Sequence, residues 1–134
     1  PARGPRGVVG FCGGRRALHA GFGAVVARLG PVDLVMLPIG AYEPRWFMGS
    51  VHANPEDAVA AYGALTAGAA IAPPCVGLHW GTFRLTDEPV EEPPARFASR
   101  WRAAGFPDVT NWTLTHGETR CLNSSSGSAD PSSR

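Results

Sequence analysis

The sequence predicts an α/β fold. Short continuous apolar runs, typical of strands buried on both faces, alternate with segments whose apolar residues recur at helical spacing. Glycine and proline separate the two kinds of segment. The chain has 134 residues, of which 44% are hydrophobic and 17% charged, which suits one domain with a packed core. This alternation of strands and helices is the layer pattern of α/β proteins.

The first elements follow from apolar spacing and from glycine or proline stops. Residues 8–11 form a short apolar run that predicts a strand. Residues 20–29 are predicted to be a helix that ends at Gly30-Pro31. Its apolar face comprises Phe22, Val25, Val26 and Leu29. Residues 33–39 are continuously apolar and predict a buried strand, whereas residues 40–53 are rich in Pro, Gly and aromatics and predict a long loop.

The next helix has the clearest start signal. Asn54 suits the N-cap, Pro55 suits the first helical position, and Glu56 and Asp57 place negative charge at the positive end of the helix. Gly68 suits its end. The buried stripe is predicted to comprise Ala58, Val59, Tyr62 and Leu65.

The remaining elements are a strand over 76–79, a helix over 94–104 and a strand over 110–114. A turn at 116–118 and a short strand ending at Leu122 are expected to follow. We expect residues 1–122 to form the domain. Residues 123–134 are Ser, Gly, Asp and Pro with almost nothing apolar, and they predict a disordered tail.

Composition excludes several classes of protein. Twelve basic and eleven acidic residues give a net charge of +1, which argues against nucleic acid as the main partner. The three cysteines lie far apart without a CxxC pair, which excludes a disulfide scaffold and a cysteine-built zinc module and favours an intracellular, reducing compartment. We find neither an apolar run of transmembrane length nor the features of a signal peptide. The acidic cluster Asp87, Glu88, Glu91 and Glu92 is interpreted as a solvated surface.

The histidines are the residues best suited to site chemistry. His79 is the last residue of a predicted strand and precedes Trp80-Gly81, a position from which a rigid strand end can present a ligand. Its alternative role is a hydrogen-bonded structural histidine. His52 lies in the long loop and His116 in a turn, where an exposed bystander is the alternative. No pair has HExxH or HxH spacing, and GxSxG, GxxxxGKS and GxGxxG are absent.

Four ordered motifs carry a family resemblance: PIGAYEPRWFM (38–48), NPEDAV (54–59), HWGTF (79–83) and HGETRCL (116–122). Together they resemble the C-terminal part of the N-acylphosphatidylethanolamine-hydrolysing phospholipase D family, within the metallo-β-lactamase superfamily. The resemblance implies the C-terminal half of an αββα sandwich. It also implies two zinc ions, whose bound water attacks a phosphodiester and releases N-acylethanolamine and phosphatidic acid.

Residue by residue, the resemblance makes His79 a zinc ligand and places His52 and His116 at the substrate. The segment 46–48 (Trp-Phe-Met) either lines an acyl channel or belongs to the core, and the core is favoured. Arg45 and Glu43 could belong to the site loop or form a structural ion pair. The substrate implies a phospholipid partner and peripheral membrane contact.

Two departures from the family pattern stand out. The HxHxDH motif and a further histidine, which supply most of the zinc ligands, are absent, and Arg15 (Gly14 in an alternative alignment) occupies the place of the bridging aspartate. We therefore expect a fragment that carries one zinc ligand, is inactive alone and exposes one sheet face, which favours aggregation or a homodimer. Two alternatives stay open: another hydrolase of the superfamily, such as a lactonase-like one, and a degenerate non-enzymatic paralogue.

Overall fold

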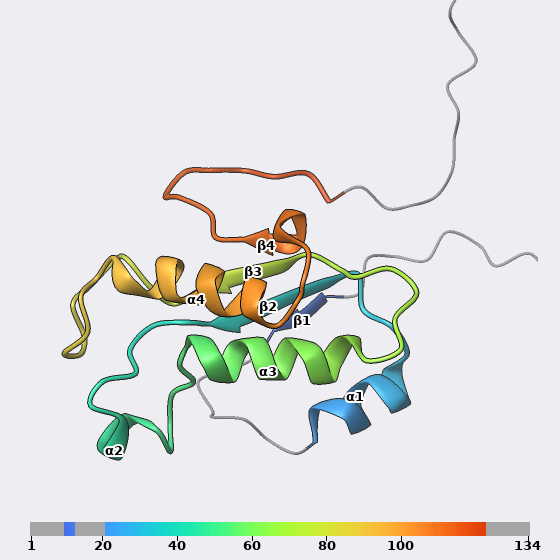
Figure 1. The fold of residues 1–134 in the computed structure, drawn as a ribbon. Helices are drawn as coiled ribbons and strands as arrows, with labels where there is room; N and C mark the ends of the chain where they lie inside the picture. The colour runs from blue at the N-terminus through green and yellow to red at the C-terminus, as the bar shows by residue number, and fades with distance from the viewer. Residues whose placement is uncertain (1–9, 13–20, 123–134) are drawn as a thin grey trace, which may run out of the picture.

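The computed structural model describes residues 10–12 and 21–122, and within them four short strands form one sheet. These are β1 (Gly10–Cys12), β2 (Leu34–Pro38), β3 (Cys75–Leu78) and β4 (Asn111–Trp112). The strands lie side by side in chain order, and every neighbouring pair is parallel (Figure 1). The carboxyl ends of all strands therefore meet at one edge of the sheet, where ligand sites of open α/β sheets lie.

The helices are α1 (Phe22–Leu29), α2 (Arg45–Met48), α3 (Pro55–Thr66) and α4 (Glu92–Ala103), and a 3₁₀ turn, η1 (Asp108–Thr110), precedes β4. The helix α3 contacts α1, α4 and β2, so that the three longer helices form one layer (Figure 1). The short α2 projects from the loop between β2 and α3.

A capping box starts α3 where the sequence predicts it. The side chain of Asn54 accepts a hydrogen bond of 2.8 Å from the backbone N–H of Asp57. In return, the Asp57 carboxylate accepts one of 3.2 Å from the backbone N–H of Asn54. Two amides that the first helical turn would leave unpaired are thereby satisfied.

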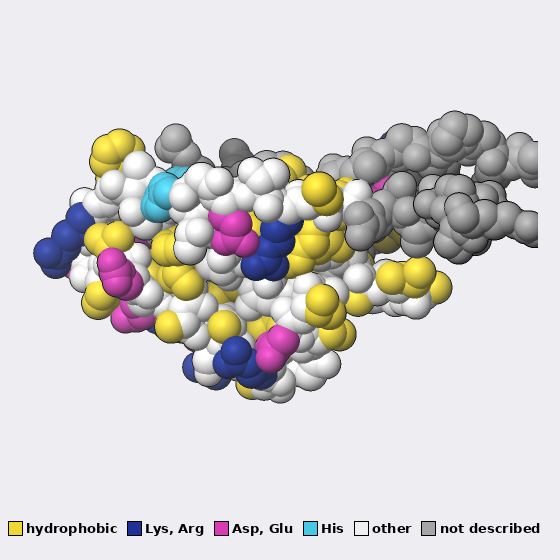
Figure 2. Space-filling view, turned by 90° about the horizontal axis from the view of Figure 1, so that it is seen from above, with side chains coloured by type: hydrophobic (Ala, Val, Ile, Leu, Met, Phe, Trp, Pro, Cys, Tyr) yellow, Lys and Arg dark blue, Asp and Glu magenta, His cyan; other side chains and the backbone are white. Residues whose placement is uncertain are grey.

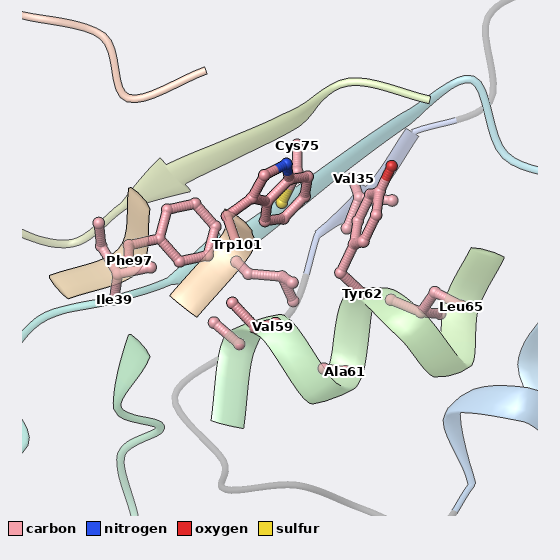
Figure 3. Packing of buried hydrophobic residues seen from close by; sticks show 11 residues of the cluster. Val35, Ile39, Val59, Ala61, Tyr62, Leu65, Cys75, Phe97 and Trp101 are labelled. Atoms are coloured by element: carbon pink, nitrogen blue, oxygen red, sulfur yellow. The ribbon is translucent and has the colours of Figure 1, made fainter. Parts of the chain in front are cut away.

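The core lies between the sheet and the helix layer (Figure 3). The rings of Tyr62 and Trp101 are 4.3 Å apart between centroids, and both residues are fully buried. Their polar atoms are also satisfied: Tyr62 donates to the carbonyl of Pro73 at 2.7 Å, and Trp101 donates to that of Pro107 at 2.9 Å. The remaining buried members of the cluster are Val35, Leu37, Ile39, Ala58, Val59, Ala61, Leu65, Cys75 and Phe97.

The two faces of the sheet differ. On β2, Val35 and Leu37 are buried in the core, whereas Leu34 and Met36 are only half-buried. The strand β3 alternates in the same way. Because successive side chains of a strand point to opposite faces, the helix layer covers one face and an apolar row lies on the other.

The predicted α/β fold is confirmed, and the main differences from the prediction concern short elements. Residues 40–53 contain α2, so they are not entirely a loop. The strand predicted over 110–114 is limited to Asn111–Trp112, because residues 108–110 form a 3₁₀ turn. The strand expected up to Leu122 is wrong: the described residues 113–122 contain none.

Boundaries moved at other elements, with β3 beginning at Cys75 and α4 at Glu92. The predicted tail 123–134 and the positions Gly14 and Arg15 lie outside the described residues. In the part of the chain that the structure describes, every helix is too short or too polar to cross a membrane.

Candidate functional site

Two of the predicted site histidines meet at the carboxyl edge of the sheet. His79 directly follows β3, and His52 lies between α2 and α3. The centroids of their imidazole rings are 5.2 Å apart. His79 has a φ of 66°, a left-handed backbone conformation that is uncommon for a residue other than glycine. Strained residues of this kind cluster at functional sites, which makes His79 a candidate on its geometry as well.

Arg45 holds the segment that carries His52. Its guanidinium donates to the His52 carbonyl at 2.8 Å and forms an ion pair of 2.8 Å with Asp57. The capping box of α3 therefore fixes the backbone of His52 as well. The alternative of a structural ion pair between Arg45 and Glu43 is wrong, because the guanidinium of Arg45 pairs with Asp57 instead. The Glu43 carboxylate accepts a hydrogen bond of 3.0 Å from the backbone N–H of Arg45.

His116 reaches the segment that begins at His79. Its Nε2 lies 3.2 Å from the hydroxyl oxygen of Thr82, and its ring centroid lies 6.3 Å from that of Trp80. All three predicted site histidines are thus gathered by the loops at this edge of the sheet. His79 and His116 are exposed, and Figure 2 shows histidine at the surface seen from above, with apolar and polar side chains around it.

A small pocket opens beside His79. Gly40 and Ala41 line it from the loop after β2, and Phe83 and Glu88 line it from the segment after β3. Gly40 is required here, because a Cβ at this position would lie 2.3 Å from the His79 carbonyl oxygen. The two loops are therefore in direct backbone contact at the site.

Glu88 is a residue that sequence reasoning missed. It is only 8% exposed, although the acidic cluster was interpreted as a solvated surface, so that interpretation is wrong for this residue. Its carboxylate accepts hydrogen bonds from three successive backbone amides, those of Ala41, Tyr42 and Glu43, at 2.6, 3.2 and 3.0 Å. No local sequence pattern predicts these hydrogen bonds, because their partners are more than forty positions apart in the chain.

The electrostatics of Glu88 follow from these contacts. Burial alone would raise the pKa of its carboxyl group. Hydrogen bonds from the side chain of Thr86 and from backbone amides, including those of Glu43 and Ala41, outweigh that effect and lower the pKa below its ordinary value. Glu88 is therefore a carboxylate at neutral pH, and its negative charge is compensated by N–H dipoles.

The aromatic residues of α2 are exposed. Trp46 and Phe47 are 87% and 63% exposed, and their ring centroids lie 5.8 Å apart. The favoured core role is therefore wrong for both. The four-residue helix α2 contains no buried residue, and neither side chain belongs to the buried cluster around Tyr62.

The described residues do not complete a metal site. Within residues 10–12 and 21–122, no three His, Cys, Asp or Glu side chains are grouped so that they could hold an ion. A zinc site needs at least three protein ligands, so His79 and His52 together fall short of one. What the pair offers is two imidazoles, each able to donate a metal-binding lone pair when neutral or an N–H to a phosphate oxygen.

Comparison with known proteins identifies a family for this α/β chain. The family model described as "Beta-lactamase superfamily domain" matches residues 2–80. A Caenorhabditis elegans protein named N-acyl-phosphatidylethanolamine-hydrolyzing phospholipase D 1 is 43% identical over 79 residues, which cover 59% of this chain and 19% of the relative. A mitochondrial N-acyl-phosphatidylethanolamine-hydrolyzing phospholipase D of Saccharomyces cerevisiae is 33% identical over 90 residues, covering 67% and 18%.

An uncharacterised protein of Mycobacterium tuberculosis strain H37Rv is 41% identical over 87 residues, covering 64% of this chain and 22% of the relative. The chain thus spans about a fifth of the length of these curated relatives. The family model nevertheless covers more than half of the chain itself. This chain therefore belongs to the β-lactamase superfamily domain family.

Proposed function

We propose that this chain forms one side of the active site of a metal-dependent hydrolase that cleaves N-acylphosphatidylethanolamine to N-acylethanolamine and phosphatidic acid. In this proposal His79 is a metal ligand, and His52 and His116 contact the substrate. The observation that carries it is the pairing of the His52 and His79 rings, 5.2 Å apart at the carboxyl edge of a parallel sheet.

The names of two relatives support the lipid substrate, since both are phospholipases D that hydrolyse N-acylphosphatidylethanolamine. The described residues do not fit a complete metal centre, so we derive no step through a metal. The proposal places the remaining ligands in the part of a longer protein that this chain does not cover.

The roles of the chain's own residues follow from how they are held. The strand end and the left-handed turn fix His79, which reduces the entropy lost when it binds a ligand. Arg45 fixes the backbone of His52 through its carbonyl. With the backbone fixed, the imidazole of His52 can donate an N–H to a phosphate oxygen, and His116 can do the same from the other loop.

Peripheral membrane contact is part of the proposal, because the substrate lies in a bilayer. Trp46 and Phe47 give the loop before His52 an exposed aromatic tip. Trp favours the membrane–water interface because its apolar ring carries a polar N–H, and Phe adds apolar surface that can insert below the headgroups. Cosedimentation with phosphatidylcholine vesicles would test this, and a variant with both residues changed to Ser should lose binding if the tip makes the contact.

The proposed activity is tested with a full-length protein that contains this sequence. We expect it to release N-acylethanolamine from vesicles, and we expect His79→Ala to lower both its zinc content and its kcat/KM, the latter by about 100-fold or more. His52→Ala should lower kcat/KM while the zinc content is retained. The exposed Arg102 of α4 provides the control, Arg102→Ala, which should change neither.

The outcomes discriminate between the candidate functions. Hydrolysis of lactones without hydrolysis of the phospholipid would favour a lactonase-like enzyme over the proposed one. An unchanged zinc content in His79→Ala would remove His79 from the metal site. We expect the 134-residue chain alone to be inactive, and turnover by that chain would overturn the proposal that other segments supply ligands.

A further inference from the structure

The carboxylate of Glu88 ties the two histidine-bearing loops together. It belongs to the segment that follows His79, yet it accepts the amides of residues 41–43 in the loop that leads to His52. The backbone N–H of Asp87 also donates to the carbonyl of Glu43 at 3.3 Å. The segment after β3 is thereby closed back onto the loop after β2.

The hydrogen bonds of Glu88 stabilise a loop, residues 41–43, whose backbone conformation is unfavourable on its own. Ala41 has a φ of 64°, a conformation that costs free energy for a residue with a Cβ. Successive amides that converge on one anion form an anion-binding concavity, which here is filled by a side chain of the same chain. Hydrogen bonds to a charged acceptor are roughly twice as strong as neutral ones. Glu88 therefore compensates for the strain at Ala41.

The same loop is in contact with the backbone of His79. Ile39 donates its N–H to the Leu78 carbonyl at 2.9 Å, and Gly40 faces the His79 carbonyl and the Trp80 backbone. A loop that shifts at residues 41–43 therefore has to shift against the left-handed turn at His79. The path from the Glu88 carboxylate to the His79 backbone consists of contacts between adjacent groups.

We infer that Glu88 is a positioning residue for the histidine site, which it holds in place through the backbone of residues 41–43 and not by touching a substrate. The inference depends on the proposed function in one respect: it takes the histidine site to be the active site. The alternative is that Glu88 contributes to stability alone, with no effect on how the rings of His52 and His79 are arranged.

Nuclear magnetic resonance of the full 134-residue chain distinguishes the two roles without metal, substrate or turnover. The change is Glu88→Gln, which keeps the shape but replaces one acceptor oxygen by an NH₂ group that faces a backbone N–H. We expect large shifts of the amide signals of residues 41–43 and about a tenfold or greater loss of their hydrogen-exchange protection. We also expect the nuclear Overhauser contact between the rings of His52 and His79 to disappear.

Glu91→Gln is the matched control, because Glu91 is an exposed glutamate in the same acidic cluster and its substitution removes the same charge. It should leave the amides of residues 41–43 and the ring contact unchanged, and the signals of α3 report whether each variant remains folded. If Glu88→Gln unfolds the chain, Glu88→Asp takes its place, since it keeps the charge but is too short to reach all three amides.

A retained ring contact in a folded Glu88 variant would overturn the positioning role, even where the chain is destabilised. A lost ring contact would support it whether or not a longer protein hydrolyses the phospholipid. Failure of the positioning role and failure of the proposed function are therefore separable.

Discussion

Removing the cap of α3 is the sharpest test of how this fold is held together. In Asn54→Ala, the backbone N–H of Asp57 loses the acceptor that now lies 2.8 Å away, while the half-buried site limits its replacement by water. Substituting an N-cap of this kind typically costs about 1 kcal/mol, within a range of about 0.5–2. Because the flanking Ala53 and Pro55 are buried, we expect about 1–1.5 kcal/mol at this site.

The assay is equilibrium unfolding in urea, followed by far-ultraviolet circular dichroism. The expected loss corresponds to a fall in melting temperature of about 3–5 °C for a domain of this size. Asn54→Asp keeps an oxygen in place to accept the same bond and adds favourable charge at the helix start. It should therefore stay within about 0.5 kcal/mol of the wild type.

A second substitution in the box gives an order of effects. Asp57→Ala removes the acceptor of the Asn54 N–H and also the ion pair with Arg45. It should cost more than Asn54→Ala, about 1.5–3 kcal/mol. The reasoning would be refuted if Asn54→Ala were as stable as the wild type, if Asn54→Asp were as destabilised as the alanine variant, or if Asp57→Ala cost less than Asn54→Ala.

Three further predictions concern the core, the pH response and the site. Tyr62→Phe removes a buried hydrogen bond to the Pro73 carbonyl and should cost about 1–1.5 kcal/mol in urea unfolding, so a neutral effect would contradict the assigned bond. Burial alone would raise the pKa of the Glu56 carboxyl group, but hydrogen bonds, chiefly from Arg96 of α4, outweigh this effect and lower the pKa below 4.5. A depressed folded pKa means that its stabilisation is present above about pH 4.5 and is lost as pH falls below that value; melting temperatures measured from pH 6 to 3 should show this fall, and Glu56→Gln should reduce it. Gly40→Ala places a Cβ 2.3 Å from the His79 carbonyl oxygen and should cost about 2 kcal/mol or more while shifting the His79 signals, whereas an unperturbed spectrum would refute the close approach.

Sequence reasoning succeeded where the physics is local. The start of α3 is encoded by four consecutive residues, 54–57: the structure begins the helix there with Asn54 as the predicted N-cap, and it adds a reciprocal bond from Asn54 to Asp57 that completes a capping box. The strand over 33–39 and the helix over 20–29 were recognisable from apolar spacing and from the Gly30-Pro31 stop. These elements depend on neighbours within a few positions, so the sequence alone carries the information.

Sequence reasoning failed where contacts are distant in the chain. Glu88 looks like any surface acid until residues 41–43 are brought against it by the pairing of β2 with β3. The sequence favours the core over an acyl channel for Trp46 and Phe47, and only the tertiary placement of α2 shows that both side chains are exposed. The family resemblance implies that His52 and His79 belong to one site, but the proximity of their rings comes from the structure, since nothing in either local sequence predicts it.

The order of the strands has a consequence for how the chain folds. Because β1, β2, β3 and β4 are neighbours in the sheet in the same order as in the chain, each pairing joins consecutive strands, with helices in the connection. Closing each such loop costs only the entropy of one connection, and each strand pairs with the next strand to be synthesised. The sheet can therefore grow one strand at a time behind the ribosome, with each new helix covering the strand laid down before it.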